Sequence, residues 1–373
     1  MRIAIDTGGT FTDCLYVRKG AIRILKVPST PQDPAQAIGQ ALGRILAAPE
    51  SGEQAECLDL ICGTTVGTNA LLERRGGRVA LVTTAGFEDL LEIGRQARPR
   101  LYDFFVERPA PLVPRERRFG LNERVGPDGR ALTRPTRAEL SRILGRVERS
   151  GAQAVAVCLL FSFANRAHER AVAHALRAKG LAASISHEIL PEFREFERTA
   201  TTVINAYLLP VMSRYLAEIA IEAAQVTGRK APRATQVRIM QSNGGIVSAR
   251  MASREPVRTI LSGPAGGVLG ASYVAGLAGY DRIITLDMGG TSTDVALVEG
   301  GIGITNESQL AELPVAVPML DIHTVGAGGG SLARFDRAGA LRVGPESAGA
   351  DPGPICYGRG VQPTVTDAHL VLE

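Results

Sequence analysis

Short apolar runs recur in pairs along this chain, and each pair is separated by a polar, glycine-containing turn. Apolar residues occupy 3–5 and 14–17, and again 283–286 and 295–298. Runs of four to eight apolar or β-branched residues bounded by glycine are typical of strands. The pattern therefore predicts two strand–turn–strand units, one at each end of the chain.

The two predicted turns are copies of one motif. Residues 6–13 (DTGGTFTD) and 287–294 (DMGGTSTD) are identical at six of eight positions. Each copy is followed by a glycine-containing link and a further short β-like run, at 21–27 and at 302–305. Because a repeat in the sequence indicates a repeated structural unit, the duplication predicts two lobes of similar architecture.

Between the copies, strand-like and helix-like segments alternate. Residues 78–84 and 154–161 are candidates for buried strands rich in Val and Leu. Residues 167–179 have a helical pattern that ends naturally at Gly180, and 182–186 resumes a short strand. This strand–helix–strand order predicts α/β layers.

A long helix is predicted over 197–228, where apolar residues recur every three or four positions. Pro210 is expected to kink this helix or to divide it in two. We place the lobe boundary near its start, so that residues 1–198 form the first lobe and residues 199–373 the second. The Pro-, Arg- and Gly-rich segment 99–135 has weak periodicity, and is interpreted as a long surface loop with short strands or as an insertion that touches a substrate or partner.

Each Gly-Gly turn suits an anion, because glycines let backbone N–H groups approach a ligand with no side chain in the way. Threonines at both turns add hydroxyl donors. The aspartates cannot bind phosphate directly, so their expected partner is a hydrated Mg2+ that bridges to phosphate oxygens. One aspartate could instead orient or deprotonate an attacking nucleophile. Two such turns facing each other would hold a phosphate-rich nucleotide from both sides.

The residues assigned to this site come from both copies of the motif. The carboxylates are Asp6, Asp13, Asp287 and Asp294, with Asp6 and Asp287 as the metal ligands. The turn residues assigned to the nucleotide are Thr7, Gly8, Gly9, Thr10, Thr12, Gly289, Gly290, Thr291 and Thr293. An ordinary glycine-rich β-turn capped by Asp and Thr is the alternative for either copy taken alone. Neither copy contains the lysine of GxxxxGK[ST] or fits GxGxxG before a helix.

Three further glycine segments are candidates for ligand contact. The turn at 63–69 can present N–H groups and hydroxyls to a ligand, or it is an ordinary helix start capped by Thr68 or Asn69. Segment 262–267, before a small-residue helix, is an anion contact or a tight-packing turn. Segment 326–331 is interpreted either as a loop that closes near the ligand or as a flexible linker. We assign Thr64, Thr65 and Asn69 to the substrate, and Gly263, Gly266, Gly267, Gly326, Gly328 and Gly329 to the nucleotide.

Two other groups of polar residues have a candidate role. Arg95 could clamp a carboxylate or carbonyl of the substrate, or form a surface ion pair. His187 with Glu188 and Glu192 has the composition of a metal cluster, but no further ligand stands at a convincing spacing, which favours a solvated loop.

The sequences of these motifs are similar to those of the hydantoinase A/5-oxoprolinase family, which belongs to the actin-like ATPase superfamily. The copy at 6–13 resembles the phosphate-1 loop of that superfamily, and the copy at 287–294 resembles its phosphate-2 loop. The stretches that carry the resemblance span almost the whole chain, and are IDTGGTFTD (5–13), GTTVGTNALLER (63–74), TTAGFEDLLEIGRQ (83–96), ERTATTVINAYLLP (197–210), QSNGG (241–245), SGPAGGVLGA (262–271), LDMGGTSTDVALV (286–298), DIHTVGAGGGSLA (321–333) and GADPGPICYGRG (349–360).

The resemblance implies a two-lobed, ribonuclease H-like α/β fold and ATP-dependent opening of a cyclic amide. ATP with Mg2+ would phosphorylate the amide oxygen of a hydantoin- or oxoproline-like ring, and water would then attack the activated carbon. A hydantoinase B-type subunit is the implied partner, within a hetero-oligomer. His323, just before the 326–331 loop, would lie near the reacting centre, although a structural hydrogen-bonding role is the alternative.

Two rival functions stay open. The first is a subunit of an ATP-dependent acetone- or acetophenone-type carboxylase, in which an enol oxygen would be phosphorylated before carboxylation. The second is a non-catalytic switch of the same fold, a reactivating factor that uses ATP to remodel a partner enzyme. Subunits of the family continue considerably beyond Glu373, so the resemblance also implies that the second lobe lacks part of its sheet here.

Composition narrows the classes of partner and location. Hydrophobic residues make up 45% and charged residues 21%, with a formal net charge of +4 and no tryptophan, which gives no reason to expect a nucleic acid or a membrane surface as partner. The five cysteines include no CxxC pair, which makes a cysteine zinc site improbable and fits a reducing compartment. No apolar run approaches the length of a membrane span, and Asp6 interrupts the N-terminal run too early for a secretory signal. We therefore expect a cytoplasmic protein.

Overall fold

The largest sheet holds the first copy of the motif. The computed structural model describes residues 1–8, 11–30, 32–47, 58–96, 102, 110–227, 235–310, 312–349 and 351–372. Six strands lie in the order β12-β11-β4-β1-β2-β3, with β1 antiparallel to β2 and parallel to β4, and β11 parallel to β4. These strands are β1 (Arg2–Thr7), β2 (Phe11–Arg18), β3 (Ala21–Pro28), β4 (Leu58–Thr64), β11 (Thr235–Met240) and β12 (Ile246–Ser248).

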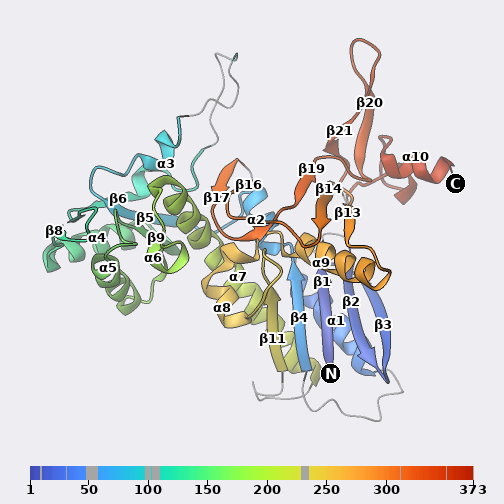
Figure 1. Cartoon of the computed structure of the whole chain (residues 1–373), viewed down its shortest axis with the longest axis horizontal. Helices are drawn as coiled ribbons and strands as arrows, with labels where there is room; N and C mark the ends of the chain where they lie inside the picture. The colour runs from blue at the N-terminus through green and yellow to red at the C-terminus, as the bar shows by residue number, and fades with distance from the viewer. Residues whose placement is uncertain are drawn as a thin grey trace.

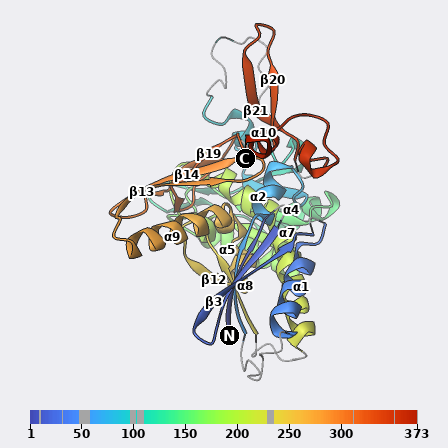
Figure 2. The ribbon, with the colours of Figure 1, turned by 90° about the vertical axis from the view of Figure 1, so that its right-hand side faces the viewer.

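Helices lie on both faces of this sheet (Figures 1 and 2). Alternate residues of β1 face the main core, where Ile3 and Ile5 join the buried side chains of α1 (Pro34–Ala47) and α7 (Glu195–Thr227). Helix α9 (Ser262–Leu277) lies on the opposite side, in contact with β4 and β11. The first Gly-Gly turn therefore leaves a strand that is fixed by neighbours on both edges.

A second sheet lies to the left in Figure 1 and is entirely parallel, in the order β10-β9-β5-β6. Its strands are β5 (Val79–Thr84), β6 (Arg118–Leu121), β9 (Ala154–Cys158) and β10 (Ala182–Ile185). One face packs against α4 (Arg137–Arg149) and α5 (Ala167–Ala178), and the other joins the core that contains α7. Both faces are buried, which explains why β5 and β9 are continuous apolar runs.

The second copy of the motif lies in a smaller sheet, β13-β14-β19. Its strands are β13 (Arg282–Met288), β14 (Thr293–Glu299) and β19 (His323–Val325). A small core that includes Ala265, Val268, Ala296 and Val298 joins this sheet to α9. Helix α9 therefore contacts the sheets of both copies.

The remaining elements are short. The helices are α2 (Val66–Leu72), α3 (Leu90–Ile93), α6 (Ser186–Ile189), α8 (Ala249–Arg254) and α10 (Val365–Leu372), with 3-10 turns at Arg115–Arg117, Pro256–Thr259 and Ile355–Tyr357. Four two-stranded pairs are β7 (Arg124–Val125) with β8 (Ala131–Thr133), β15 (Ile304–Thr305) with β18 (Met319–Leu320), β16 (Ser308–Leu310) with β17 (Leu313–Val315), and β20 (Ser331–Phe335) with β21 (Leu341–Ser347). Within the described ranges, no helix combines the length and apolar character needed to cross a bilayer.

Most predicted elements are confirmed, and three boundaries or interpretations are wrong. The helix at 197–228 forms as one element, Glu195–Thr227, with Pro210 inside it, so the division into two helices does not occur. The strand predicted at 154–161 ends at Cys158. The described part of 99–135 is more than a surface loop, because β6 pairs with β5 inside the parallel sheet. The lobe division at 198/199 stays a prediction, and the pairing of β11 with β4 crosses it.

Candidate functional site

The two copies of the motif form hairpins of the same register. Asp6 pairs with Asp13 across β1 and β2, and Asp287 pairs with Asp294 across β13 and β14. In the first turn the N–H of Gly8 donates to the carbonyl of Phe11 over 3.0 Å, and in the second the N–H of Gly289 donates to the carbonyl of Ser292 over 2.9 Å. The repeat in the sequence is therefore a repeat in structure. Gly9 and Thr10 lie outside the described residues.

The two hairpins approach each other across the first turns of α9. An ideal Cβ on Gly263 would lie 3.4 Å from Oδ1 of Asp6, and one on Gly267 would lie 3.6 Å from Oδ2 of Asp287. Burial raises the pKa of Asp6, and the charges of Asp13 and Asp287 raise it further. Burial also raises the pKa of Asp294, with Asp287 adding to the effect, against a hydrogen bond from Thr324. Negative charge therefore accumulates at the place where the hairpins meet.

The turn after β4 completes the wall beside Asp6. An ideal Cβ on Gly63 would lie only 3.1 Å from Oδ1 of Asp6, so glycine is needed for this close approach. The hydroxyl of Thr65 donates to the carbonyl of Thr7 over 3.1 Å. Thr65 is the residue that precedes α2, so a cap by Thr68 or Asn69 is wrong. The amide of Asn69 instead reaches the hydroxyl of Thr65, at 3.5 Å.

Segment 262–267 is not a loop before a helix, because α9 already begins at Ser262. The fully buried hydroxyl of Ser262 accepts from the N–H of Thr64 over 3.2 Å and donates to its carbonyl over 3.0 Å. Ser262 thus ties the N-terminus of α9 to the turn beside Asp6. This contact of Ser262 with Thr64 was not predicted from the sequence.

A cleft of about 390 Å3 lies beside Asp6. Its lining combines Asp6, Asp13, Gly63, Ser262, Gly263, Gly266 and Gly267 with apolar side chains that include Ala4, Leu15, Ile61 and Met240. Five of the sequence-predicted residues therefore line one cavity: Asp6, Asp13, Gly263, Gly266 and Gly267.

The glycine-rich loop at 326–331 packs directly on the second turn. The N–H groups of Gly329 and Gly330 donate to the carbonyls of Gly289 and Gly290 over 2.9 and 2.6 Å. A Cβ on Gly328 would lie 2.6 Å from the carbonyl oxygen of Gly289, so only glycine fits there. The loop therefore lies beside the second turn, as predicted. The N–H groups of Gly328 and Gly329 are already bonded within the protein, so a contact of either with a nucleotide stays a prediction.

The other predicted site residues have varied surroundings. The hydroxyl of Thr12 bonds to Ser29, that of Thr293 donates to the carbonyl of Ala327, and Thr291 is exposed. Arg95 forms a bidentate ion pair with Glu197, with both N–O distances 2.7 Å. His323 is exposed on β19, where its backbone pairs with Val295 beside Asp294.

The region around His187 is not a metal cluster, since the described ranges contain no group of three or more His, Cys, Asp or Glu residues placed to share an ion. The solvated-loop interpretation is also wrong for His187. Its ring is buried, and Nδ1 lies 2.6 Å from Oε2 of Glu169, a carboxylate with no exposed surface. His187 thus neutralises or hydrogen-bonds a buried acid that is distant in sequence.

Two buried hydroxyls lie near the first turn: that of Thr7, which was assigned to the nucleotide from the sequence, and that of Tyr215, which the sequence pattern did not indicate. Thr7 is 2% exposed and Tyr215 of α7 is 3% exposed. Neither hydroxyl makes a well-formed hydrogen bond within the described part of the chain. Buried polar atoms are rarely left unpaired, so the base of the first turn has spare hydrogen-bonding capacity.

The fold and the site define a class of protein: two lobes of α/β structure, each with a carboxylate-bearing Gly-Gly hairpin, are the architecture of the actin-like ATPases. Family models described as "Hydantoinase/oxoprolinase N-terminal region" and "Hydantoinase/oxoprolinase" match residues 2–180 and 198–373. The chain belongs to the hydantoinase/oxoprolinase family.

Relatives and solved structures agree with this assignment. The chain is 40% identical to caprolactamase subunit alpha of Pseudomonas jessenii and 37% identical to 5-oxoprolinase 1 of Arabidopsis thaliana; all of this chain is covered, but only 54% and 31% of those relatives. The crystal structure of the ATP-dependent caprolactamase superimposes with a TM-score of 0.85 at 39% identity, covering 100% of this chain and 55% of that one. The nucleotide-free acetone carboxylase superimposes with a TM-score of 0.81 at 30% identity, covering 100% and 54%.

Proposed function

We propose that this chain binds Mg–ATP between its two hairpins and phosphorylates the amide oxygen of a cyclic amide, which drives opening of the ring. The observation that carries the proposal is the meeting of Asp6 and Asp287, from two copies of one motif, across the N-terminus of α9. The likeness to an ATP-dependent caprolactamase and to 5-oxoprolinases supports the choice of a cyclic amide.

The residues at the site fit a magnesium nucleotide. Gly63 and Gly263 leave a space beside Asp6 that a Cβ would fill. Mg2+ is usually held by one or two carboxylates, with water and phosphate oxygens as the other ligands, and we assign the two carboxylates to Asp6 and Asp287. When bound, Mg–ATP would supply the phosphoryl group and neutralise the charge that develops on its oxygens.

The chain's own groups would position and hold the reactants. In this proposal the turns at 7–12 and 289–293 would present N–H and hydroxyl donors to phosphate oxygens. The N–H groups of Gly8 and Gly289 would not be among them, because they are bonded within the turns. Lys26 holds Asp13 through an ion pair of 2.9 Å, and the hydroxyl of Thr324 holds Asp294 over 2.6 Å, so both second carboxylates are fixed in orientation. His323, exposed beside Asp294, is assigned as the group that moves a proton to or from the substrate.

Several further assignments belong to the proposal. Thr64, Thr65, Asn69 and Arg95 would contact the substrate, and for Arg95 this requires that it exchange Glu197 for the ligand. A B-type subunit would complete the reaction in a hetero-oligomer, as the description of the caprolactamase relative as a subunit supports. A cytoplasmic location would suit the buried free thiols Cys14, Cys62 and Cys158.

A second candidate is an ATP-dependent ketone carboxylase subunit, which the likeness to acetone carboxylase favours. The same site would then phosphorylate the enol oxygen of the ketone, before its carboxylation, in place of an amide oxygen. Both candidates use the same nucleotide site, so they differ only in the acceptor.

Phosphate release distinguishes the candidates. The chain, alone and with the product of a neighbouring B-type gene, is incubated with Mg–ATP and with lactams, hydantoins, 5-oxoproline, or ketone plus bicarbonate. Release that depends on a cyclic amide supports the proposal, and release that depends on ketone plus bicarbonate supports the second candidate. Phosphate release that does not depend on any small molecule but is stimulated by a protein would identify a remodelling ATPase and would contradict both candidate functions.

A further inference from the structure

A second cavity lies away from the two hairpins. It has a volume of about 640 Å3 and lies between the parallel sheet and the helices α7 and α8. That volume is within the range of small-molecule sites, which occur preferentially at the boundaries between structural units. None of the proposed nucleotide residues lines it.

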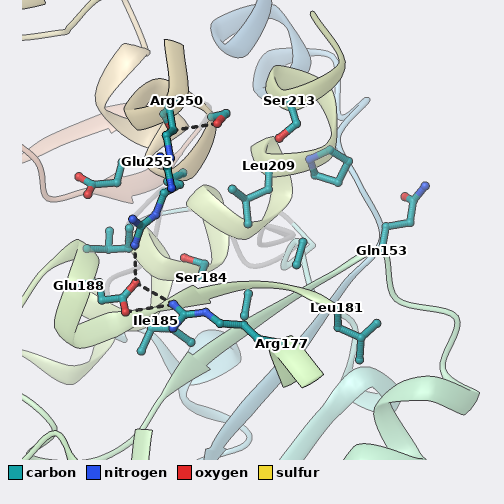
Figure 3. A pocket seen from close by; sticks show the side chains of 16 residues that line it. Gln153, Arg177, Leu181, Ser184, Ile185, Glu188, Leu209, Ser213, Arg250 and Glu255 are labelled. Atoms are coloured by element: carbon teal, nitrogen blue, oxygen red, sulfur yellow. Dashed lines mark hydrogen bonds and ion pairs between the residues drawn. The ribbon is translucent and has the colours of Figure 1, made fainter. Parts of the chain in front are cut away.

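The charged groups of this cavity leave positive charge in excess. Three arginines line it, Arg177, Arg250 and Arg254, against the two acids Glu188 and Glu255. Glu188 is shared, at 3.1 Å from Arg177 and 3.6 Å from Arg254, and these contacts are the dashed lines that meet on Glu188 in Figure 3.

The remaining acid is not available to balance the third arginine. Glu255 is held at 2.7 Å by Arg258, which does not line the cavity. Arg250 makes no ion pair within the ranges that the structure describes. One guanidinium at the mouth of the cavity is therefore without a counter-charge.

The rest of the lining is apolar or neutral. Leu181 and Ile185 belong to the parallel sheet unit, and Leu209 and Pro210 belong to α7. In Figure 3 the charged side chains Arg250, Glu188 and Arg177 lie along one side, and Leu209, Ser213 and Gln153 lie along the other. A ligand that fits must combine an anionic group with an apolar body.

We propose that this cavity is a second ligand site, which takes a small monocarboxylate with an aliphatic tail. The carboxylate pairs with the guanidinium of Arg250, whose planar fork matches a carboxylate in two-point contact. The tail lies over the partly exposed side chains of Leu181, Ala183 and Pro210. The site does not depend on the proposed ATP-dependent function, because no residue is shared between them.

The test measures binding by titration calorimetry to the full chain without nucleotide. Hexanoate is the probe, and hexanamide and hexylammonium are its neutral and cationic counterparts. Hexanoate should bind saturably, about tenfold more tightly than hexanamide and with no detectable binding of hexylammonium, because a charge-assisted pair is lost. Its affinity should fall as salt is raised, since the guanidinium is partly exposed to solvent.

Two variants and a matched control locate the site. Arg250→Gln should weaken hexanoate about tenfold and leave hexanamide unchanged. Ser213→Phe, on an exposed position of α7 that lines the cavity, should weaken both ligands by filling the space. Arg337→Gln removes an exposed arginine between β20 and β21, and should change neither.

Circular dichroism confirms that each variant is folded before the titration is interpreted. Equal binding of hexanoate and hexanamide, no saturable binding of hexanoate, or an unchanged affinity in both Arg250→Gln and Ser213→Phe would each overturn the proposal. These results are independent of phosphate release, so failure here leaves the nucleotide assignment unaffected.

Discussion

The two hairpins share a sequence and a register but not their surroundings. β1 is a central strand with β2 on one edge and β4 on the other, whereas β13 is an edge strand, with β14 its sole neighbour in the described sheet. Ile3 and Ile5 of β1 are 0% and 2% exposed, whereas Ile284 and Leu286 of β13 are 72% and 67% exposed. Within the described residues, the first motif thus follows a central strand with a buried face, and the second follows an edge strand with exposed side chains.

The difference shows that the motif determines the local turn, while its neighbours determine the electrostatics. Asp6 is crowded by Gly63 and Gly263 and loses water, which raises its pKa. Both carboxylates keep exposed surface, and what differs is their crowding: an ideal Cβ on Gly63 would lie 3.1 Å from Asp6, whereas the one on Gly267 would lie 3.6 Å from Asp287. If both carboxylates bind one magnesium ion, the more crowded Asp6 has less room to adjust to the ion than Asp287 has.

The largest expected effect comes from removing the carboxylates themselves. Asp6→Ala and Asp287→Ala should each lower Mg–ATP turnover by roughly a hundredfold or more, because each removes a ligand that neutralises charge on the phosphates. The fold should be retained in both. Calorimetry with a non-hydrolysable ATP analogue and Mg2+ measures the loss directly. Full binding in both variants would refute the assignment of the site.

The next largest effect is expected from disturbing the close approach of Gly63 to Asp6 in the first hairpin. Gly63→Ala puts a methyl 3.1 Å from Oδ1 of Asp6, which should displace the carboxylate and lower turnover roughly tenfold, since small misplacements of a catalytic group are costly. Gly270→Ala is the control, because nothing lies within 4 Å of its Cβ and α9 should gain about 0.5–1 kcal/mol of stability. Wild-type turnover in Gly63→Ala would show that the crowding has no functional role.

A stability measurement tests the electrostatic contrast. Burial raises the pKa of Asp6 in the folded chain above its usual value of 3.8, so the folded state binds this proton more tightly than the unfolded state does. The unfavourable contribution of the ionised group is absent below pH 3.8, grows between 3.8 and the folded pKa, and is complete above the folded pKa. Asp6→Asn should therefore raise Tm at pH 7.5 and lose this advantage near pH 3.8.

Asp287→Asn is the matched comparison for that measurement. Its carboxylate is less crowded than that of Asp6, with the nearest glycine Cβ position 3.6 Å away, so Tm should change little in thermal scans without nucleotide. A larger rise in Asp287→Asn than in Asp6→Asn would contradict the idea that crowding distinguishes the two carboxylates.

The smallest effect concerns Lys26, which lies on β3 opposite Asp13 of the first hairpin. Lys26 pairs with Asp13 at 2.9 Å, and its charge lowers the pKa of Asp6. Lys26→Gln should raise the pKa of Asp6, which moves the acidic limb of the pH–rate profile to higher pH. The free energy of unfolding should change by less than about 1 kcal/mol, because the pair is exposed. A shift of that limb to lower pH would contradict the charge network.

The sequence was informative wherever the pattern was local. The duplicated motif located both hairpins, and the apolar runs at 78–84 and 182–186 located strands that the structure contains. The burial of β5 on both faces leaves a continuous apolar run, which is a strong local signal.

Features that depend on distant contacts could not be found this way. The hydroxyl of Ser262 bonds to Thr64, 198 residues earlier in the chain. β6 was hidden because its first residue, Arg118, is charged; its guanidinium is buried and satisfied by the carbonyl of Val113 and by Glu92. In the same way, the sequence around His187 is polar and predicts exposure, although His187 is buried against Glu169.

The glycine loop at 326–331 has a consequence for motion between the lobes. Its backbone is bonded to Gly289 and Gly290 on one side, and on the other the carbonyl of Gly329 accepts from the N–H and the hydroxyl of Thr366 in α10, each over 2.8 Å. These hydrogen bonds fix the backbone of a glycine-rich segment, which therefore loses its conformational entropy on folding. If the sheets that carry the two hairpins move relative to each other when a ligand binds, the second turn and α10 would move together, and this loop would need no further ordering.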